Sequence, residues 1–245
     1  MRLLVKLGSI LIIGMASLPA LAQQQDTYDY TSEFTWGINK NSAGGLIGGF
    51  TFKKAKKLND NMLETFGLEI MNVKHSSEAR RSSRSTGNFF IYGKSNYLYA
   101  FRFQYGRDFI LFRKAPQQGA EIKAVLAAGP SLSLLAPYYI EVAVDQSLFV
   151  TRSAQYDPNN PAHSFNNILG TGRVFEGLGE SNVQLGINAK AALNFELGIT
   201  KSQVAGFEIG FLVDTYFNEI ILMPTAKNSG VFPTVFFTLF YGNRK

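Results

Sequence analysis

The sequence predicts an all-β protein, a transmembrane antiparallel up-and-down β-barrel of eight strands, with ten strands as the alternative. Long segments alternate apolar and polar residues with a period of two, which is the period of a strand. The clearest segment, 183–199, is longer than the roughly 3 to 10 residues of most globular strands and exceeds the about 9 to 11 that a tilted membrane strand needs. One of its faces is apolar and the other carries charges, which fits lipid on one side and a lumen on the other.

The second observation is an N-terminal segment, 1–22, with the features of a secretory signal peptide. Arg2 and Lys6 precede an apolar centre, and the small-residue end Ala20–Ala22 precedes the expected cleavage site. The apolar centre is shorter than the about 20 residues that span a bilayer. With no cysteine in the chain, we expect neither disulfides nor an acyl anchor at the cleavage site. Residues 23–31 should form a periplasmic tail and 32–245 the barrel.

The composition agrees with a barrel. Mean hydropathy is zero although 46 % of the residues are hydrophobic, because alternating strands interleave apolar and polar residues. Aromatic residues (13 %) and 23 glycines suit aromatic girdles and tight turns. Without the two basic residues of the signal segment the net charge of +6 falls to about +4, which does not indicate nucleic acid.

Eight segments carry the alternation in chain order: 33–39, 46–53, 62–74, 97–107, 121–134, 183–199, 207–217 and 231–242. The fourth places five aromatic residues on one face, from Tyr97 to Tyr105, which suits lipid with tyrosines near the headgroups. Residues 109–114 interrupt the alternation, and we interpret them as a structured turn at the barrel rim. A ten-strand barrel would follow if 137–151 paired with one more segment.

An even number of strands places both termini on one side, which we expect to be periplasmic. The outer connections would then be 40–44, 75–94, 136–181 and 218–230, and the periplasmic ones 54–61, 107–118 and 200–203. Residues 75–94 lack periodicity and are expected to form a long loop, whereas 136–181 should carry local structure. The lysine cluster 53–57 is interpreted as a solvated connection, with an anion or headgroup site as the alternative.

The signal segment, the eight alternating segments and the aromatic last strand, 235–241, together resemble the small outer-membrane β-barrel proteins, the OmpA/OmpX-like and PorT-like group. The resemblance covers the mature chain in pattern, and the ending Gly242–Lys245 departs from the aromatic last residue of many members. It implies an outer-membrane location, insertion by the barrel assembly machinery and, from its PorT-like part, association with a secretion complex.

The polar faces of the expected strands place nine charged residues in the lumen: Glu33, Glu69, Arg102, Glu121, Lys123, Lys190, Glu196, Glu208 and Asp214. Side chains fill the interior of an eight-stranded barrel, so these charges should pair with one another or hold trapped water. A structural network of ion pairs is the expectation, and a narrow ion pathway is the alternative.

Two kinds of loop residue, clustered arginines and histidines beside serines, are further candidate site residues. Arg80, Arg81 and Arg84 could bind lipopolysaccharide phosphates, or could form a solvated loop tip. His75 lies beside Ser76, Ser77 and Glu78, a set of residue types that lipid A deacylating barrels use, although loop histidines are usually only exposed. His163 also lies beside a serine, and no spacing of residues indicates a metal site or a cofactor.

The function expected from these observations is that of a non-enzymatic integral outer-membrane barrel with a structural or binding role in the cell envelope. Its expected partners are outer-membrane lipid and lipopolysaccharide, the assembly machinery, and an envelope or secretion complex. A small pore and a lipid A-modifying enzyme are the alternatives.

Overall fold

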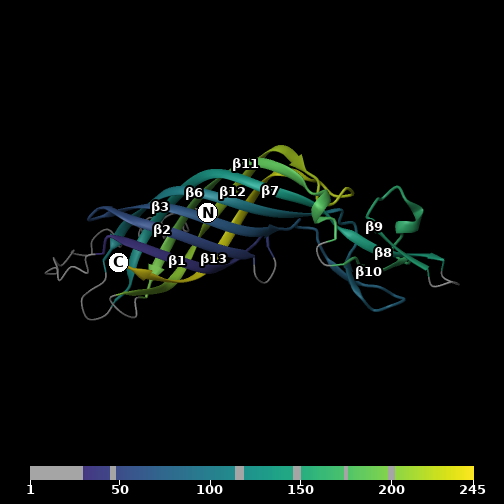
Figure 1. Cartoon of the computed structure of the whole chain (residues 1–245), viewed down its shortest axis with the longest axis horizontal. Coiled ribbons are helices and arrows are strands. Elements are labelled where there is room, and N and C mark those ends of the chain that lie inside the picture. The colour runs from purple at the N-terminus through teal and green to yellow at the C-terminus, as the bar shows by residue number, and fades with distance from the viewer. Residues whose placement is uncertain (1–29, 45–47, 114–118, 146–149, 174–175, 198–201) are drawn as a thin grey trace, which may run out of the picture.

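A computed structural model of the protein describes residues 30–44, 48–113, 119–145, 150–173, 176–197 and 202–245. The expected signal peptide, 1–22, and most of the expected tail lie outside these ranges. Eight long strands close into an antiparallel barrel (Figure 1). They are β1 (Ser32–Asn41), β2 (Gly49–Asn59), β3 (Met62–Val73), β6 (Asn96–Phe112), β7 (Glu121–Pro137), β11 (Asn182–Glu196), β12 (Gln203–Ile220) and β13 (Ser229–Arg244).

The barrel has the up-and-down topology that the sequence predicts, since every strand pairs antiparallel with its neighbours in the ring order β1-β13-β12-β11-β7-β6-β3-β2. A path through partnered residues leaves β13 at Asn243, passes once around the barrel and returns to β13 at Pro233, ten positions away (243 against 233). With about 3.3 Å per residue and about 4.8 Å between strands, this shift corresponds to a strand tilt of about 40°. The tilt lies in the range of membrane barrels.

The five short strands lie outside the ring, so the eight-strand prediction is confirmed and the ten-strand alternative is wrong. β8 (Tyr139–Asp145), β9 (Val150–Gln155) and β10 (Ile168–Thr171) form a separate sheet in the order β10-β8-β9. β4 (Arg80–Ser82) and β5 (Phe89–Ile91) form a hairpin. We call these strands and their connections, the described parts of 75–95 and 138–181, the loop subdomain.

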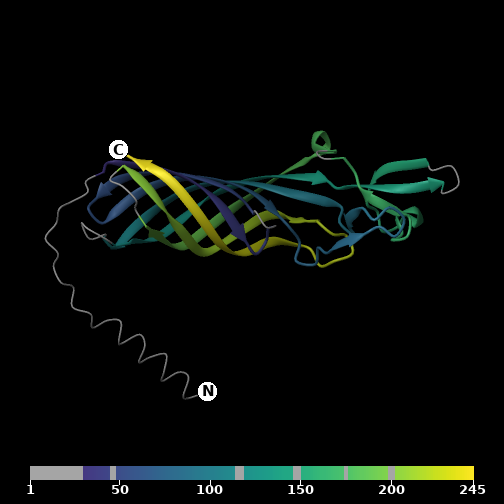
Figure 2. The same ribbon diagram turned by 90° about the horizontal axis from the view of Figure 1, so that it is seen from below.

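The loop subdomain occupies one end of the molecule, which we call the loop end, and the C-terminus lies at the other, the terminal end (Figure 2). The first described residues also lie at the terminal end, because the backbone N–H of Thr31 donates to the carbonyl of Lys245 at 2.8 Å. Within the described ranges, no helix has the length and apolar character that crossing a membrane requires.

Alternate residues of each barrel strand point outward and inward, and the outward ones are apolar. Phe211 and Leu239 are 67 % and 59 % exposed, and Trp36, Phe66 and Ile187 are also exposed on the outside. A soluble protein rarely leaves so large an apolar surface in water. The exterior is therefore the lipid-facing surface of a transmembrane barrel.

Three expectations about the connections are wrong. Residues 109–112 do not form a turn, because β6 continues to Phe112, and residue 114 lies outside the described ranges. A register shift between Ile110 and Phe112 explains the lost alternation. The lysine cluster is not a connection, because β2 continues to Asn59 and its lysines alternate between lumen and exterior. The 75–94 segment contains the β4–β5 hairpin, which three-residue strands are too short to reveal as periodicity.

Candidate functional site

The barrel interior is densely charged. All nine residues expected to face the lumen lie there, and none is more than 8 % exposed. Their positions follow from strand alternation: the polar face of β12, for example, turns Glu208 and Asp214 inward while Phe211 faces out. In the barrel these residues, which are distant in sequence, form two clusters of ion pairs.

Arg102 of β6 organises the part of the network nearer the loop end. Its Nε lies 3.0 and 3.1 Å from the two carboxylate oxygens of Asp214, its Nη2 is 2.5 Å from Asp214 Oδ2, and its Nη1 is 3.3 Å from Glu69 Oε2. Lys190 bridges Glu69 and Glu208 at 2.8 and 2.7 Å. Each of these charges is buried, so partners on other strands, several of them across the lumen, replace the water that each has lost.

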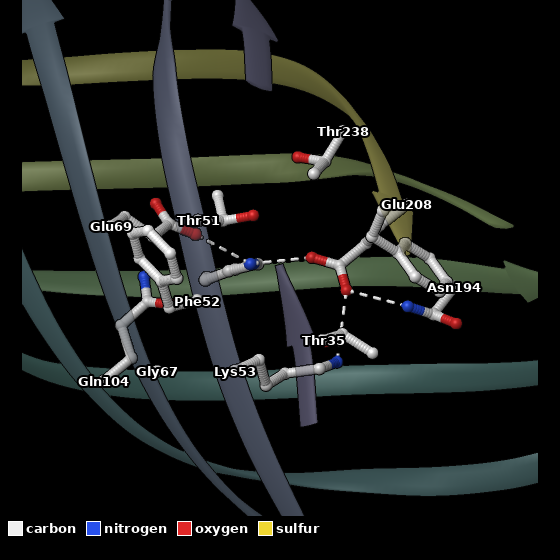
Figure 3. Close-up of a pocket in the computed structure, with 12 residues that line it drawn as sticks. Thr35, Thr51, Phe52, Lys53, Gly67, Glu69, Gln104, Asn194, Glu208 and Thr238 are labelled. Atoms are coloured by element: carbon white, nitrogen blue, oxygen red, sulfur yellow. Dashed lines mark hydrogen bonds and ion pairs between the residues drawn. The ribbon is translucent and has the colours of Figure 1, made fainter. Parts of the chain in front are cut away.

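Lys53 and Asp108 extend this network, and we did not predict either as a lumen residue. Lys53 Nζ lies 2.8 Å from Asp108 Oδ2 and 3.4 Å from Glu208 Oε2, and Figure 3 shows Glu208 between Lys53 and Asn194. A cavity of about 30 Å³ adjoins them, lined by Thr35, Thr51, Phe52, Lys53, Gly67, Glu69, Gln104, Lys190, Asn194, Glu208, Thr238 and Phe240. This volume holds water molecules and nothing larger.

A second cluster closes the terminal end. Lys123 lies 3.5, 3.1 and 3.4 Å from Glu33, Glu121 and Glu196, and Arg244 contacts the same three carboxylates. The Tyr30 ring covers this cluster, with Lys123 Nζ 5.8 Å from its centroid. Arg244 is the third lumen residue that the prediction missed, although its even number on β13 places it on the inward face.

Tyr30 lies over the guanidinium of Arg244, with the Arg244 Cζ 3.9 Å from the ring centroid, and its hydroxyl donates to Glu121 at 3.4 Å. With the three added residues the interior holds five cationic side chains (Lys53, Arg102, Lys123, Lys190 and Arg244) against seven carboxylates. The balance of paired charges is therefore closer to neutral than the three bases and six acids of the sequence prediction.

The interior is apolar at the loop end. A cluster of buried residues crosses it: Met71, Val73, Leu98, Ala100, Tyr216, Ile220 and Leu222. The connection between β12 and β13 supplies Leu222, whose carbonyl accepts from the N–H groups of Ser95 and Asn96 at 2.9 and 3.3 Å. Loop residues therefore lie across the mouth, and the lumen has a charged section and an apolar section.

The loop subdomain has a core of its own. Phe90 of β5 packs with Tyr138, Ile140, Val142, Tyr156 and Ile168, so two connections that are distant in sequence share one cluster. The Tyr138 hydroxyl accepts from the N–H of Ile91 at 3.0 Å. The cluster packs these two connections against each other, and Tyr97 of β6 packs against its edge.

A buried ion pair lies inside the subdomain, next to Tyr97 of the barrel strand β6. Lys94 is fully buried, its Nζ lies 2.8 Å from both carboxylate oxygens of Glu78, and the Tyr97 ring centroid is 4.3 Å away. Burial lowers the pKa of Lys94, and Glu78 opposes that change. In the same subdomain, burial raises the pKa of Tyr156 to about 12.

The remaining candidate residues are not brought together into one site. The His75 ring accepts from the N–H of Ser77 at 3.1 Å and contacts the carbonyl of Lys227 at 3.0 Å, while Glu78 is paired with Lys94. The buried His163 ring accepts from the N–H of Asp157 at 2.9 Å. Among the residues that the structure describes, no group of three or more His, Asp or Glu side chains has a metal-holding arrangement.

The three arginines of the β4–β5 region also differ in environment. Arg80 stacks on Phe89 with its Cζ 4.8 Å from the ring centroid, and Arg84 lies 5.7 Å from that of Phe165. Neighbouring residues of a strand point to opposite faces, so the guanidinium groups of Arg80 and Arg81 do not lie side by side on one face of β4.

Fold and interior together define the class: a small eight-stranded transmembrane β-barrel of the outer-membrane type, with a filled interior. No protein-family model matches the chain, and no curated protein sequence matches it. Among solved structures, the chain is similar to Ail, the attachment invasion locus protein of Yersinia pestis, at 11 % identity, with 89 % of this chain and 99 % of that chain covered and a TM-score of 0.40.

The structure of Ail with the heparin analogue sucrose octasulfate gives 10 % identity, the same coverage of each chain and a TM-score of 0.40. Neisserial surface protein A gives 11 % identity, coverage of 91 % of this chain and 100 % of that chain, and a TM-score of 0.33.

Proposed function

We propose that this chain is a non-conducting outer-membrane barrel that presents the loop subdomain for binding, with the loop end outside the cell and both termini in the periplasm. The observation that carries the proposal is the separate core of the subdomain around Phe90 and Ile140. Loops that only connect strands do not need a buried core, whereas a surface that must keep its shape for a partner does.

The filled interior favours a barrel that anchors the loop subdomain in the membrane and does not act as a channel. An ion moving along the axis would have to pass the apolar cluster that includes Leu98 and Leu222 and then the ion pairs around Arg102. Displacing either one costs packing or leaves buried charges unpaired. The small-pore alternative therefore has no specific observation in its favour.

The partners remain those that the sequence indicates: outer-membrane lipid and lipopolysaccharide, the assembly machinery and an envelope complex. An accessory role in secretion is the finer proposal, and it depends on the PorT-like resemblance. We also propose that the chain is not an enzyme, because Glu78 and the His75 ring, two parts of the hypothetical deacylase set, are engaged in structural contacts.

Conductance measurements test the sealed interior. Purified protein reconstituted in planar bilayers should give no current steps, and a Leu222→Ala variant should stay closed because the ion pairs around Arg102 remain. Regular steps from the unaltered protein would contradict the sealed barrel and favour the pore.

External protease on intact cells tests the orientation and the folded subdomain. Tyr138→Ala, which removes a fully packed ring, should make 138–181 cleavable, whereas Tyr138→Phe keeps the ring and should resist like the unaltered chain. The barrel should remain folded in each variant, as shown by heat-modifiable migration on a detergent gel. Cuts confined to the connections that follow β2 and β6, 60–61 and 113–120, would invert the orientation.

A further inference from the structure

Two outward-facing lysines lie on β2 near the terminal end of the barrel. Lys54 and Lys56 alternate with inward-facing Lys53 and Ala55, and the side chains of both are exposed. They are two residues apart on one face, so their Cα atoms are about 7 Å apart. Among the described residues, no Asp or Glu side chain forms an ion pair with either lysine.

The strand ladders extend this basic surface to β3 and β6. Lys56 faces Glu64 of β3, and Glu64 faces Arg107 of β6. Arg107 Nη1 lies 3.0 Å from Glu64 Oε1, to which the Tyr105 hydroxyl also donates at 2.7 Å. We call Lys54, Lys56 and Arg107 the basic patch. Its three cations against the one carboxylate of Glu64 leave a net charge of +2.

The basic patch borders the apolar belt on its loop-end side. Phe66 and Tyr105 lie in the same row as Lys54, with their ring centroids 5.2 Å apart. One row farther toward the loop end, Phe52 and Phe103 are 39 % and 48 % exposed. A molecule that contacts both the patch and this belt must therefore carry a charged group next to an apolar one, as a lipid does.

The adjoining arc of the wall, formed by β7, β11 and β12, is apolar at the same height. Its outward row consists of Ile122, Phe195 and Phe207. At a tilt of about 40°, a row climbs about 3 Å per strand toward the loop end, and a strand descends about 2.5 Å per residue toward the terminal end. Three strands separate Lys56 from Leu126, and Ile122 lies four residues below Leu126. The climb and the descent cancel to within about 1 Å.

The rim at the terminal end is therefore basic over one arc and apolar over the next. A charge on the lipid-facing side of a barrel is tolerated close to the membrane interface and is costly toward the midplane, so the patch lies at headgroup level. Lysines that served only to anchor the barrel at the interface would be useful around the whole rim. Their concentration beside Phe66 and Tyr105 instead favours one ligand position.

We propose that the basic patch binds the headgroup of an anionic phospholipid in the leaflet at the terminal end. The amines of Lys54 and Lys56 contact the phosphate, and the acyl chains lie over Phe66 and Phe52. The surplus positive charge favours a headgroup with a net negative charge over a zwitterionic one, whose own cation the patch repels. This inference rests on the proposed function, which places the barrel in a membrane.

Quenching of the single tryptophan, Trp36, by brominated acyl chains tests the proposal. Trp36 faces Phe52 in the β1–β2 ladder, two residues from Lys54, and is 48 % exposed on the exterior. The protein is reconstituted in mixed vesicles of phosphatidylcholine and phosphatidylglycerol, and one of the two lipids carries bromine. The two quenching curves give the association constant of phosphatidylglycerol relative to phosphatidylcholine. At low salt this ratio should be about fivefold or more, since each basic residue near an anionic headgroup contributes roughly that factor.

Two variants locate the preference on the patch. Lys54→Gln combined with Lys56→Gln should bring the ratio close to one. Lys40→Gln combined with Lys227→Gln removes the same charge from exposed positions outside the patch and should leave the ratio unchanged. Heat-modifiable migration on a detergent gel checks that each variant is folded.

A second reporter needs no change to the lysines. In a Trp36→Phe background, Phe195→Trp places the indole on the apolar arc at the same height, where the ratio should be close to one. This comparison decides the question even where the lysine variants do not fold.

The outcomes separate the inference from the proposed function. A ratio near one at Trp36, with quenching by both lipids, would overturn the inference and leave the membrane location intact. Absence of quenching by either lipid would contradict the membrane location itself. An equal preference at Phe195→Trp, or one that persists without Lys54 and Lys56, would assign the effect to the overall charge of the protein and overturn the inference.

Discussion

Replacing Arg102 by methionine should destabilise the barrel by about 3 to 5 kcal/mol, because it leaves a buried carboxylate without its cation. Asp214 is 0 % exposed and accepts three contacts from Arg102, and afterwards it would keep only the Ser131 hydroxyl at 3.1 Å. Glu69 would retain Lys190 at 2.8 Å, so the expected cost comes from Asp214. Methionine fills much of the space of the arginine stem, which keeps packing loss small.

Urea unfolding of the protein in lipid vesicles, followed by heat-modifiable migration, measures this cost. With a slope of about 2 kcal/mol per molar urea, the midpoint should fall by about 2 M. Arg102→Lys keeps the positive charge and loses the forked guanidinium that binds both oxygens of Asp214. Its urea midpoint should therefore lie between those of the unaltered protein and Arg102→Met. Adding Asp214→Asn to Arg102→Met removes the stranded charge and should recover part of the loss. A midpoint shift below about 0.5 M for Arg102→Met would refute the reasoning that the network is a stabilising unit.

Three further outcomes are expected. Arg244→Met leaves Lys123 alone against three carboxylates, so the unfolding midpoint should fall at pH 7 and fall less at pH 4, where protonation relieves the repulsion. Pro233→Ala adds an N–H to the edge of β13 beyond the β1–β13 ladder and should cost about 1 to 3 kcal/mol in vesicles, unlike Pro130→Ala in β7, a strand that pairs on both sides. The raised pKa of Tyr156 means that the unfolded phenol ionises first. Subdomain stability that is present below pH 10 should be lost toward pH 12, as followed by protease resistance, and less of it should be lost in Tyr156→Phe.

Strand alternation was sufficient to predict the barrel and its inward residues. Facing lipid on one side and charge on the other imposes a strict period of two, so the inward face of Glu208 and Asp214 could be derived from the pattern alone. The lysine-rich composition of 53–57 predicted a connection where the period of two indicated a strand. Lys53 has the same parity as Thr51 on the inward face of β2, yet the lysines around it suggested a wet connection.

The loop subdomain could not be derived in the same way. Its strands have three to seven residues, too few to show a period, and its core joins Phe90 to Ile140 and Ile168 across about fifty to eighty positions of sequence. The bulge between Ile110 and Phe112 is a comparable case, because the extra residue shifts the alternation while the ladder continues. In both cases the information lies in contacts between segments that the sequence pattern does not relate.

The two sections of the lumen follow from the height of the wall around them. Where all eight strands are present, the interior is cut off from lipid and water, and charged side chains are tolerated only because each has partners within reach, as Arg102 does. Beside the short β1–β2 hairpin fewer strands surround the interior, so an ion pair would have fewer partners within reach, and loss of one would leave a bare charge. Apolar residues such as Phe232 carry no such risk. The short β1–β2 hairpin on one side of the barrel therefore favours apolar residues in the part of the lumen beyond the ends of these two strands.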